Sequence, residues 1–296
     1  MDSQTKALLY SLIALIGWGL GNSLAKEYSK RLSPSKLAVY RNLTTVCITA
    51  LAVALFWSKT VFNLNYIFLG FGLAVLGYIG YFFFLKGLET GNLGLIQPVS
   101  SSRIVISSII GTTFLKDHLS GLQWFFIFVI FIGVALCSVD PKNLKKSELF
   151  TPKSGIPFAL LNAVIWGVVY PFYSVPSAVL GAFLFSFILE FTGLWLSLIQ
   201  TRLNHRSIRL TKTELKENLP GLLMVGLAGG IGSVFVNLGY STGHIGIVSA
   251  VSSAVPIIAV TYGKYVYKEQ LNKRQVLAVA LTVAGIILLA SFRSQH

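Results

Sequence analysis

Long apolar runs dominate this sequence and limit what the chain can fold into. They lie at roughly residues 7–25, 37–57, 65–88, 94–115, 121–139, 155–174, 178–201, 219–239, 245–267 and 275–292. Several reach the roughly 20 residues that an α-helix needs to cross a bilayer. Alternating strand patterns of about ten residues, which are typical of outer-membrane barrels, do not occur in the sequence. The sequence therefore predicts an all-α integral membrane protein with ten transmembrane helices.

The charged residues agree with a membrane location and argue against nucleic-acid binding. Only 11% of residues are charged, whereas a soluble domain carries about 25%. The formal net charge is +14, but nearly all basic residues lie in short gaps between apolar runs. No basic domain is present that could hold a phosphate backbone. We expect no nucleic acid among the partners.

The chain also repeats itself. TGNLGLIQPVSSSRIV (90–105) returns as TGHIGIVSAVSSAVPI (242–257), and GTTFLKDHLSGLQ (111–123) returns at the same offset of 152 as GKYVYKEQLNKRQ (263–275). These matches predict a first five-helix repeat over 1–139, an inter-repeat loop over 140–154, and a second repeat over 155–296. Because five spans per half is an odd number, the second half enters the membrane from the opposite side. Such inverted repeats are typical of secondary transporters.

Several features together resemble one known family. The chain has ten predicted spans, a Trp-Gly pair in the first helix of each half (residues 18–19 and 166–167), and Pro34 followed by Arg41 at the second helix. With the TG-x-x-G-L/I…V-S-S stretch, they resemble EamA-type transporters of the drug/metabolite transporter superfamily. The resemblance implies a small-metabolite carrier, often an exporter. It also implies a central cavity built from the first four helices of each half, with the fifth helices outside.

Basic residues are distributed unequally between the two sides of the predicted membrane domain. The gaps after the first, fifth, seventh and ninth spans hold 16 Lys and Arg, and the other side holds 4. Because Lys and Arg accumulate on the cytoplasmic side, this asymmetry predicts that both termini face outward. The family resemblance implies the reverse orientation, with both termini in the cytoplasm.

Two charged residues lie deep in apolar runs. Glu190 is near the middle of the seventh span and Arg103 near the middle of the fourth. Charged residues inside a membrane are costly and are candidates for function. Three interpretations stay open: an ion pair that joins the two halves, a cavity-facing pair, or contact of at least one with a headgroup or water. In a cavity, the planar fork of Arg103 would hold a carboxylate or phosphate. Glu190 would hold an amine or a proton.

Arg41 and a set of uncharged residues are further candidates. Arg41 lies only about five residues into its span, so it either extends to the interface or flanks the cavity mouth. The repeat places Trp18, Asn22, Trp166 and Tyr170 in the first helix of each half, where they either pack in the core or line the cavity. An unpaired amide in lipid is costly, which favours a role for Asn22. The weaker candidates are Asn237, Gln97, Tyr78, Tyr81 and Ser100 to Ser102.

The sequence motifs favour a carrier over other classes. No phosphate-binding loop, HExxH, GxSxG or Cys/His cluster occurs, so we expect no enzyme, no cofactor and no metal. We expect a secondary active transporter of small polar metabolites in the cell membrane, working by alternating access. Amino acids or related zwitterions are candidate substrates, export the candidate direction, and a proton or cation gradient the candidate driving force. Membrane lipid surrounds such a chain, and a monomer is plausible. A channel or non-transporting receptor is the alternative, with an intramembrane enzyme behind both.

Overall fold

The computed structural model describes residues 1–32, 34–90, 93–138, 152–205, 207–266, 268 and 273–292. Every regular element in this part of the chain is helical. The α-helices are α1 Ser3–Arg31, α2 Pro34–Leu55, α3 Leu64–Thr90, α4 Leu93–Ser101, α5 Arg103–Phe114, α6 Gly121–Ser138, α7 Ile156–Phe172, α8 Ser174–Leu180, α9 Ala182–Leu203, α10 Lys212–Tyr240, α11 Ile245–Ser252, α12 Pro256–Val266 and α13 Lys273–Ser291. Two short 3-10 helices, Trp57–Lys59 and Pro152–Ser154, complete the list. Of the predicted inter-repeat loop, only 152–154 lie within the described residues.

The ten predicted spans correspond to thirteen helices, because three spans are interrupted. The fourth span breaks at Ser102, directly after the repeated V-S-S, and the ninth breaks at 253–255, beginning at the last serine of that motif. The sixth breaks at Tyr173, two residues after Pro171, and runs to Leu180, so the predicted limits 155–174 and 178–201 are wrong there. Among the described residues, seven segments are long and apolar enough to cross a membrane. The chain is thus an all-helical membrane protein, although a count of ten spanning helices is a prediction.

Local sequence explains where the two longest helices begin. The Asp2 carboxylate accepts a hydrogen bond from the Thr5 backbone N–H at 2.7 Å and caps α1. Thr211 and Glu214 form a reciprocal capping box at the start of α10. Such caps satisfy backbone N–H groups that have no partner within the helix. Both helices therefore begin in polar sequence and continue into apolar sequence, as expected where a helix enters a membrane.

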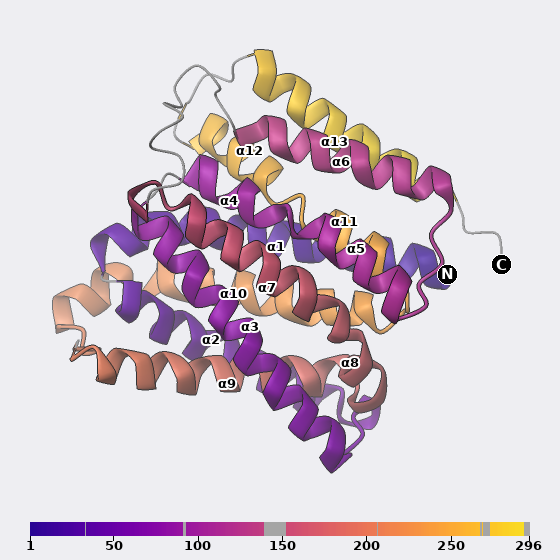
Figure 1. The fold of residues 1–296 in the computed structure, drawn as a ribbon. Helices are drawn as coiled ribbons and strands as arrows, with labels where there is room; N and C mark the ends of the chain where they lie inside the picture. Colours follow the sequence, from indigo (N-terminus) through magenta and orange to yellow (C-terminus); the bar gives the residue numbers. More distant parts are fainter. Residues whose placement is uncertain are drawn as a thin grey trace.

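The two halves pack across each other rather than side by side (Figure 1). Helix α1 of the first half lies along α10 of the second, and α3 lies along α7. The second helices of the two halves, α2 and α9, also pack together. Figure 1 shows α7 starting at the opposite end of the bundle from α1. The fifth helices, α6 and α13, pair at one edge of the bundle.

Equivalent tryptophan–glycine contacts join the halves. The Trp18 ring of α1 packs on Gly232 of α10, and the Trp166 ring of α7 packs on Gly80 of α3. The two glycines are 152 residues apart, which is the offset of the sequence repeat. A Cβ atom at either glycine would collide with the facing indole. Small residues at these points let the helix backbones approach closely, as is usual between transmembrane helices.

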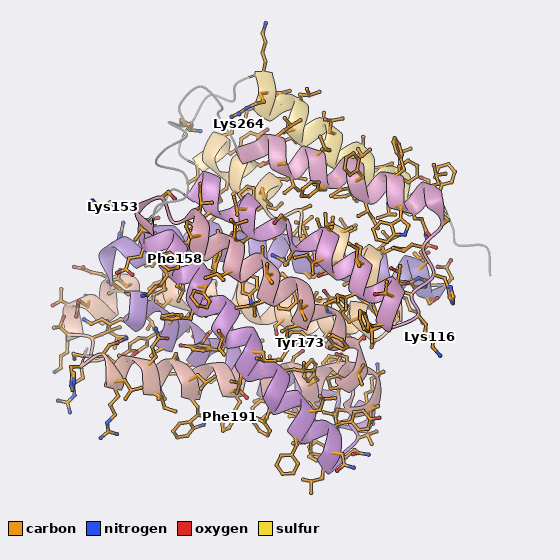
Figure 2. The ribbon with its side chains drawn as sticks, viewed as in Figure 1. Lys116, Lys153, Phe158, Tyr173, Phe191 and Lys264 are labelled. Carbon is orange, nitrogen blue, oxygen red and sulfur yellow. The ribbon has the colours of Figure 1, made fainter. Side chains whose placement is uncertain are left out.

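The outer surface of the bundle is apolar and its two ends differ in charge. Large side chains such as Phe68 (65% exposed) and Trp195 (54% exposed) face outward, as lipid-facing residues do. We call the end where α1 begins and α13 finishes the terminus end, and the opposite end the basic end. Figure 2 shows Lys153 and Lys264 toward the basic end and Lys116 at the terminus end. The bundle therefore has the surface polarity of a membrane domain.

Candidate functional site

A cavity of about 130 Å³ lies between the two halves near the middle of the bundle. Most residues singled out from the sequence lie in its wall, which includes Trp18, Asn22, Arg41, Tyr78, Tyr81, Gln97, Arg103, Trp166, Tyr170, Glu190 and Asn237, whereas Ser100 to Ser102 are not part of it. The remaining lining comes from α2, α3, α9 and α10 and from the helix breaks at Tyr173 and Val255. No described residue of α6 or α13 takes part. Binding pockets usually measure about 300–1,000 Å³, so a solute would need side chains in this cavity to move.

Glu190 pairs with Arg41 and not with Arg103. Its Oε2 lies 3.5 Å from Nη1 of Arg41 and accepts a hydrogen bond from Thr45 Oγ1 at 2.9 Å. Depth along each helix suggested an Arg103–Glu190 pair, but the close packing of α2 on α9 gives Glu190 a nearer cation. The same packing corrects the expectation that Arg41 extends to the interface, since its side chain is only 19% exposed. The second helices of the two halves are thus joined by an ion pair in the cavity wall.

Arg103 is a buried cation without an acidic partner among the described residues. The residue is 3% exposed, and its Nη1 has no hydrogen-bond partner in that part of the chain. Its Cζ lies 5.3 Å from the ring centre of Trp166 and 5.4 Å from that of Tyr170. The aromatic faces attract the guanidinium, but they cannot accept its hydrogen bonds as a carboxylate would. Arg103 therefore presents donors that remain available at the cavity.

Aromatic rings form the wall beneath Arg103. Trp166 stacks on Tyr170 with ring centres 5.2 Å apart, and Tyr170 lies 6.1 Å from Trp18. Trp166 is fixed by a hydrogen bond of 2.9 Å from its indole N–H to the carbonyl of Gly77 in α3. The first helices of both halves therefore contribute to one aromatic surface. Such a surface is rigid and can contact the apolar part of a small solute.

Amide side chains provide the neutral polar groups of the cavity. Asn22 of α1 donates a hydrogen bond to Gln97 of α4 at 3.2 Å. Asn237 of α10 donates to Ser186 of α9 at 2.9 Å, and its own Oδ1 has no partner among the described residues. These groups can exchange hydrogen bonds with a polar solute. The sequence alone gave Asn237 and Gln97 little weight, and the structure brings both to the cavity wall.

Further cavity residues were not singled out from the sequence. Asn42, next to Arg41 on α2, lines the cavity; its Oδ1 accepts a hydrogen bond from Arg41 Nη1 at 2.7 Å, and its amide N–H donates to the carbonyl of Gly193 at 3.1 Å. Thr45 lies one helical turn after Arg41 and reaches Glu190. The signal for Thr45 was available, because a polar residue at i+4 lies on the same helix face as the membrane arginine. Tyr173 lines the cavity because α7 breaks there.

The cavity is closed at the terminus end. A buried apolar cluster, including Tyr173, Phe185, Val236 and Tyr240, lies on that side. Toward the basic end, a smaller hollow of about 40 Å³ continues from the cavity, with Ala25, Leu37 and Leu88 in its wall. The space around the site thus extends toward the basic end.

Asp117 helps to hold the terminus end closed. It lies in the loop between α5 and α6, outside the spanning segments, and its Oδ2 accepts the Gly246 backbone N–H of α11 at 2.6 Å. Burial raises the pKa of Asp117 above its ordinary value. The hydrogen bond from Gly246 and the nearby His244 and His118 act in the opposite direction and are outweighed. A loop of the first half thereby caps a helix of the second.

The described residues contain no group of His, Cys, Asp or Glu arranged to hold a metal ion. The central site is instead a polar and aromatic cavity between two crossed halves of a helical membrane protein. That combination defines the class as a membrane protein with a polar cavity at the interface of internal repeats.

Comparison with known proteins then gives the family. The model of the EamA-like transporter family matches residues 5–139 and 153–291. The chain belongs to this family, and so to the drug/metabolite transporter superfamily. A solved structure titled "Crystal structure of protein" aligns with a TM-score of 0.75 at 18% identity, covering 95% of each chain. At that identity the likeness shows the fold alone. A search of curated proteins finds no match.

Proposed function

We propose that this transporter is a secondary carrier of small polar metabolites that bear a carboxylate, zwitterionic amino acids among them, and that it works by alternating access. The observation that supports the proposal most strongly is Arg103, a buried cation with unused donors at the cavity wall. Export across the cell membrane is part of the proposal, since carriers that resemble this chain are often exporters.

The balance of energies favours an anionic group as the partner of Arg103. Burying one charge in a protein costs several kcal/mol even after relaxation. Each of the two aromatic contacts of Arg103, with Trp166 and Tyr170, stabilises the buried guanidinium by about 0.5–2 kcal/mol. The two contacts together therefore offset only part of the cost. A carboxylate can satisfy the free end of the guanidinium through two parallel hydrogen bonds and supply the missing negative charge.

The charges around the cavity support the same choice. Arg41 and Arg103 contribute two positive charges, and Glu190 contributes one negative charge. The cavity therefore has an excess of one positive charge. A solute with one carboxylate neutralises this excess, and a zwitterion can do so locally while its ammonium group interacts with Glu190.

Uptake into reconstituted vesicles tests the proposal. Wild-type protein should exchange labelled carboxylates saturably and discriminate against the corresponding amides. Arg103→Gln should lower kcat/KM about 10–100-fold, the value of a charged hydrogen-bonded contact of about 1.5–3 kcal/mol. Arg31→Gln is the matched control, because Arg31 is exposed and pairs with Glu27 at the end of α1.

The other outcomes are equally definite. Equal transport of acids and amides by the wild type would remove the carboxylate from the proposal. Flux that does not saturate would indicate a channel, and chemical change of the solute would indicate an enzyme.

Glu190 is the proposed coupling residue. Protonation, or an arriving substrate, would break its ion pair with Arg41 and loosen the contact between α2 and α9. Glu190→Gln should therefore abolish accumulation driven by a proton gradient while exchange between equal solute pools continues. Glu27→Gln, at an exposed position of α1, is the matched control. Full accumulation by Glu190→Gln would exclude the coupling role.

A further inference from the structure

A second hollow lies on the flank of the bundle between α3 and α9. Its volume is about 660 Å³, within the range of about 300–1,000 Å³ that is usual for ligand sites. The two helices meet where Phe185 packs on Gly70, with 3.4 Å between the ring and the position of a Cβ. From that crossing they diverge toward the basic end (Figure 1), and the hollow occupies the space between them. We call it the flank groove.

The flank groove is apolar inside and polar at its mouth. Its inner walls include Ile79 and Phe82 of α3 and Leu196 and Ile199 of α9. Ile79 is 39% exposed and Ile199 49% exposed, so the groove opens sideways toward lipid. At the basic end the lining changes to Lys86, Glu89, Gln200 and Asn204. This gradient of polarity matches a membrane leaflet, with hydrocarbon inside and headgroups outside.

The length of the flank groove also matches one leaflet. On α3 the lining extends from Tyr78 to Glu89, which are 11 positions apart. At a rise of 1.5 Å per residue this is about 16 Å. The part from Tyr78 to Lys86, where the lining becomes polar, is about 12 Å long, and half the hydrocarbon thickness of a bilayer is about 15 Å. An acyl chain from the leaflet at the basic end can therefore lie in the groove over its full depth.

We infer that the flank groove binds one phospholipid with a primary-amine headgroup, phosphatidylethanolamine, through an acyl chain and both charges of its headgroup. Lys86 and Glu89 lie one turn apart at the mouth, and neither forms an ion pair within the described residues. The Lys86 ammonium lies 5.3 Å from the ring centre of Phe82 and 5.7 Å from that of Phe158. It can bind the lipid phosphate while Glu89 accepts hydrogen bonds from the ammonium.

This pair of charges selects among headgroups. Phosphatidylcholine has no N–H to donate to the Glu89 carboxylate. Phosphatidylglycerol brings a phosphate for Lys86 but no cation for Glu89. The basic loops of the same end attract anionic lipids in general, so a preference for phosphatidylethanolamine would have to come from the groove itself.

Tyr78 separates the flank groove from the central cavity. It belongs to the lining of both, and its hydroxyl donates to Gln200 at 2.6 Å. The inner end of the acyl chain would thus lie against the ring that also borders the transport site. The inference goes beyond the proposed transport function, and lipid binding can be measured without any substrate.

Native mass spectrometry of the delipidated full-length protein tests the inference. The protein is mixed with equal amounts of dioleoyl phosphatidylethanolamine, phosphatidylcholine and phosphatidylglycerol. We expect one retained phosphatidylethanolamine, preferred about tenfold, as two charged contacts would allow. Ile199→Trp fills the groove and should reduce this binding at least tenfold. Ile109→Trp is the matched control, since Ile109 is a similarly exposed isoleucine (47%) on α5.

A second variant separates the headgroup from the chain. Lys86→Gln combined with Glu89→Gln should keep one lipid bound but lose the preference for phosphatidylethanolamine. Both positions are exposed at a helix end, so the fold is expected to be retained, which thermal unfolding checks. Equal binding of the three lipids by the wild type, a preference for phosphatidylglycerol, or unchanged binding by Ile199→Trp would overturn the inference. None of these results would alter the outcome expected for Arg103→Gln in transport.

Discussion

Two junctions join the halves through corresponding helices, and they differ in the size of the residue at one equivalent position. In one junction, α2 of the first half packs on α10 of the second. In the other, α9 of the second half packs on α3 of the first. Gly230 of α10 lies against Ile48 of α2, with 3.2 Å from the side chain to the position of a Cβ. The residue of α3 at the repeat offset of 152 is Tyr78. A glycine lies at the close contact of the first junction, and a tyrosine that borders the flank groove takes the equivalent position in the second.

The difference shows how a duplicated sequence acquires distinct sites. The repeat keeps a glycine against each tryptophan, Gly232 against Trp18 and Gly80 against Trp166. The way in which the halves cross is therefore the same at both contacts. Single substitutions then change local properties. Where the second half has Gly230, the first half has Tyr78, which borders the flank groove. Where the second half has Val255, the first half has Arg103, which places a charge on one wall of the cavity. The shared residues therefore set the architecture, while the unshared residues supply the chemistry.

The largest effect is expected from placing an aromatic residue in the α2–α10 junction, as the α3–α9 junction has at Tyr78. Gly230→Phe places a ring against Ile48 and should destabilise the protein by about 3 kcal/mol or more, through overpacking. Thermal unfolding of purified protein measures the loss. Gly72→Phe is the matched control, because nothing lies within 4 Å of a Cβ added there. Equal stability of the two variants would show that the α2–α10 contact does not depend on close approach.

A smaller effect should distinguish the two equivalent tryptophans. Trp166→Phe loses the hydrogen bond to Gly77 and weakens the contact with Arg103, about 2 kcal/mol in total. We expect carboxylate binding to weaken by roughly tenfold or more. Trp18→Phe keeps the aromatic surface and should weaken binding less than threefold. Titration of the same carboxylate into each variant decides the matter, and equal losses would contradict a special role for the Arg103 side of the cavity.

The smallest effect concerns the loop contact at the terminus end. The pKa of Asp117 is raised on folding from an ordinary value of 3.8, so the folded state binds more protons than the unfolded state above that pH. Its contribution to stability is therefore greatest at low pH and is lost as pH rises through the raised pKa. In Asp117→Asn, the free energy of unfolding should vary less with pH than in the wild type, and the difference should be less than about 1 kcal/mol. Unfolding temperatures between about pH 4 and 5.5, below the ordinary pKa of histidine, measure it. A wild-type stability that rises with pH there more steeply than that of the variant would contradict this sign.

Much of the helical framework follows from the sequence because length and polarity in a membrane allow few alternatives. The apolar runs predicted where the helices lie. Pro98 lies in the fourth span and Pro256 in the ninth, and these two spans, which are equivalent in the repeat, are both interrupted. The break at Tyr173 was not predicted, since Pro171 has no counterpart in the first half that would have marked it.

Which residues interact with one another at the site was harder to predict than which residues lie there. Position along a helix gives the depth of a residue in the bilayer, which is why Arg103 and Glu190 were expected at similar heights. It does not give the rotation of the helix or the identity of its neighbours. Because α2 lies on α9, Glu190 interacts with Arg41 and Thr45, and Arg103 is left to the aromatic wall.

The most direct test of the carboxylate site is a thermal-shift screen with purified wild-type protein and Arg103→Gln. The panel pairs small carboxylic acids, amino acids included, with their amides. Ligand binding to the folded state raises the unfolding temperature. We expect acids that stabilise the wild type but not Arg103→Gln, with no matching effect of the amides. Stabilisation of both proteins by the same acids, or of the wild type by acids and amides alike, would contradict it.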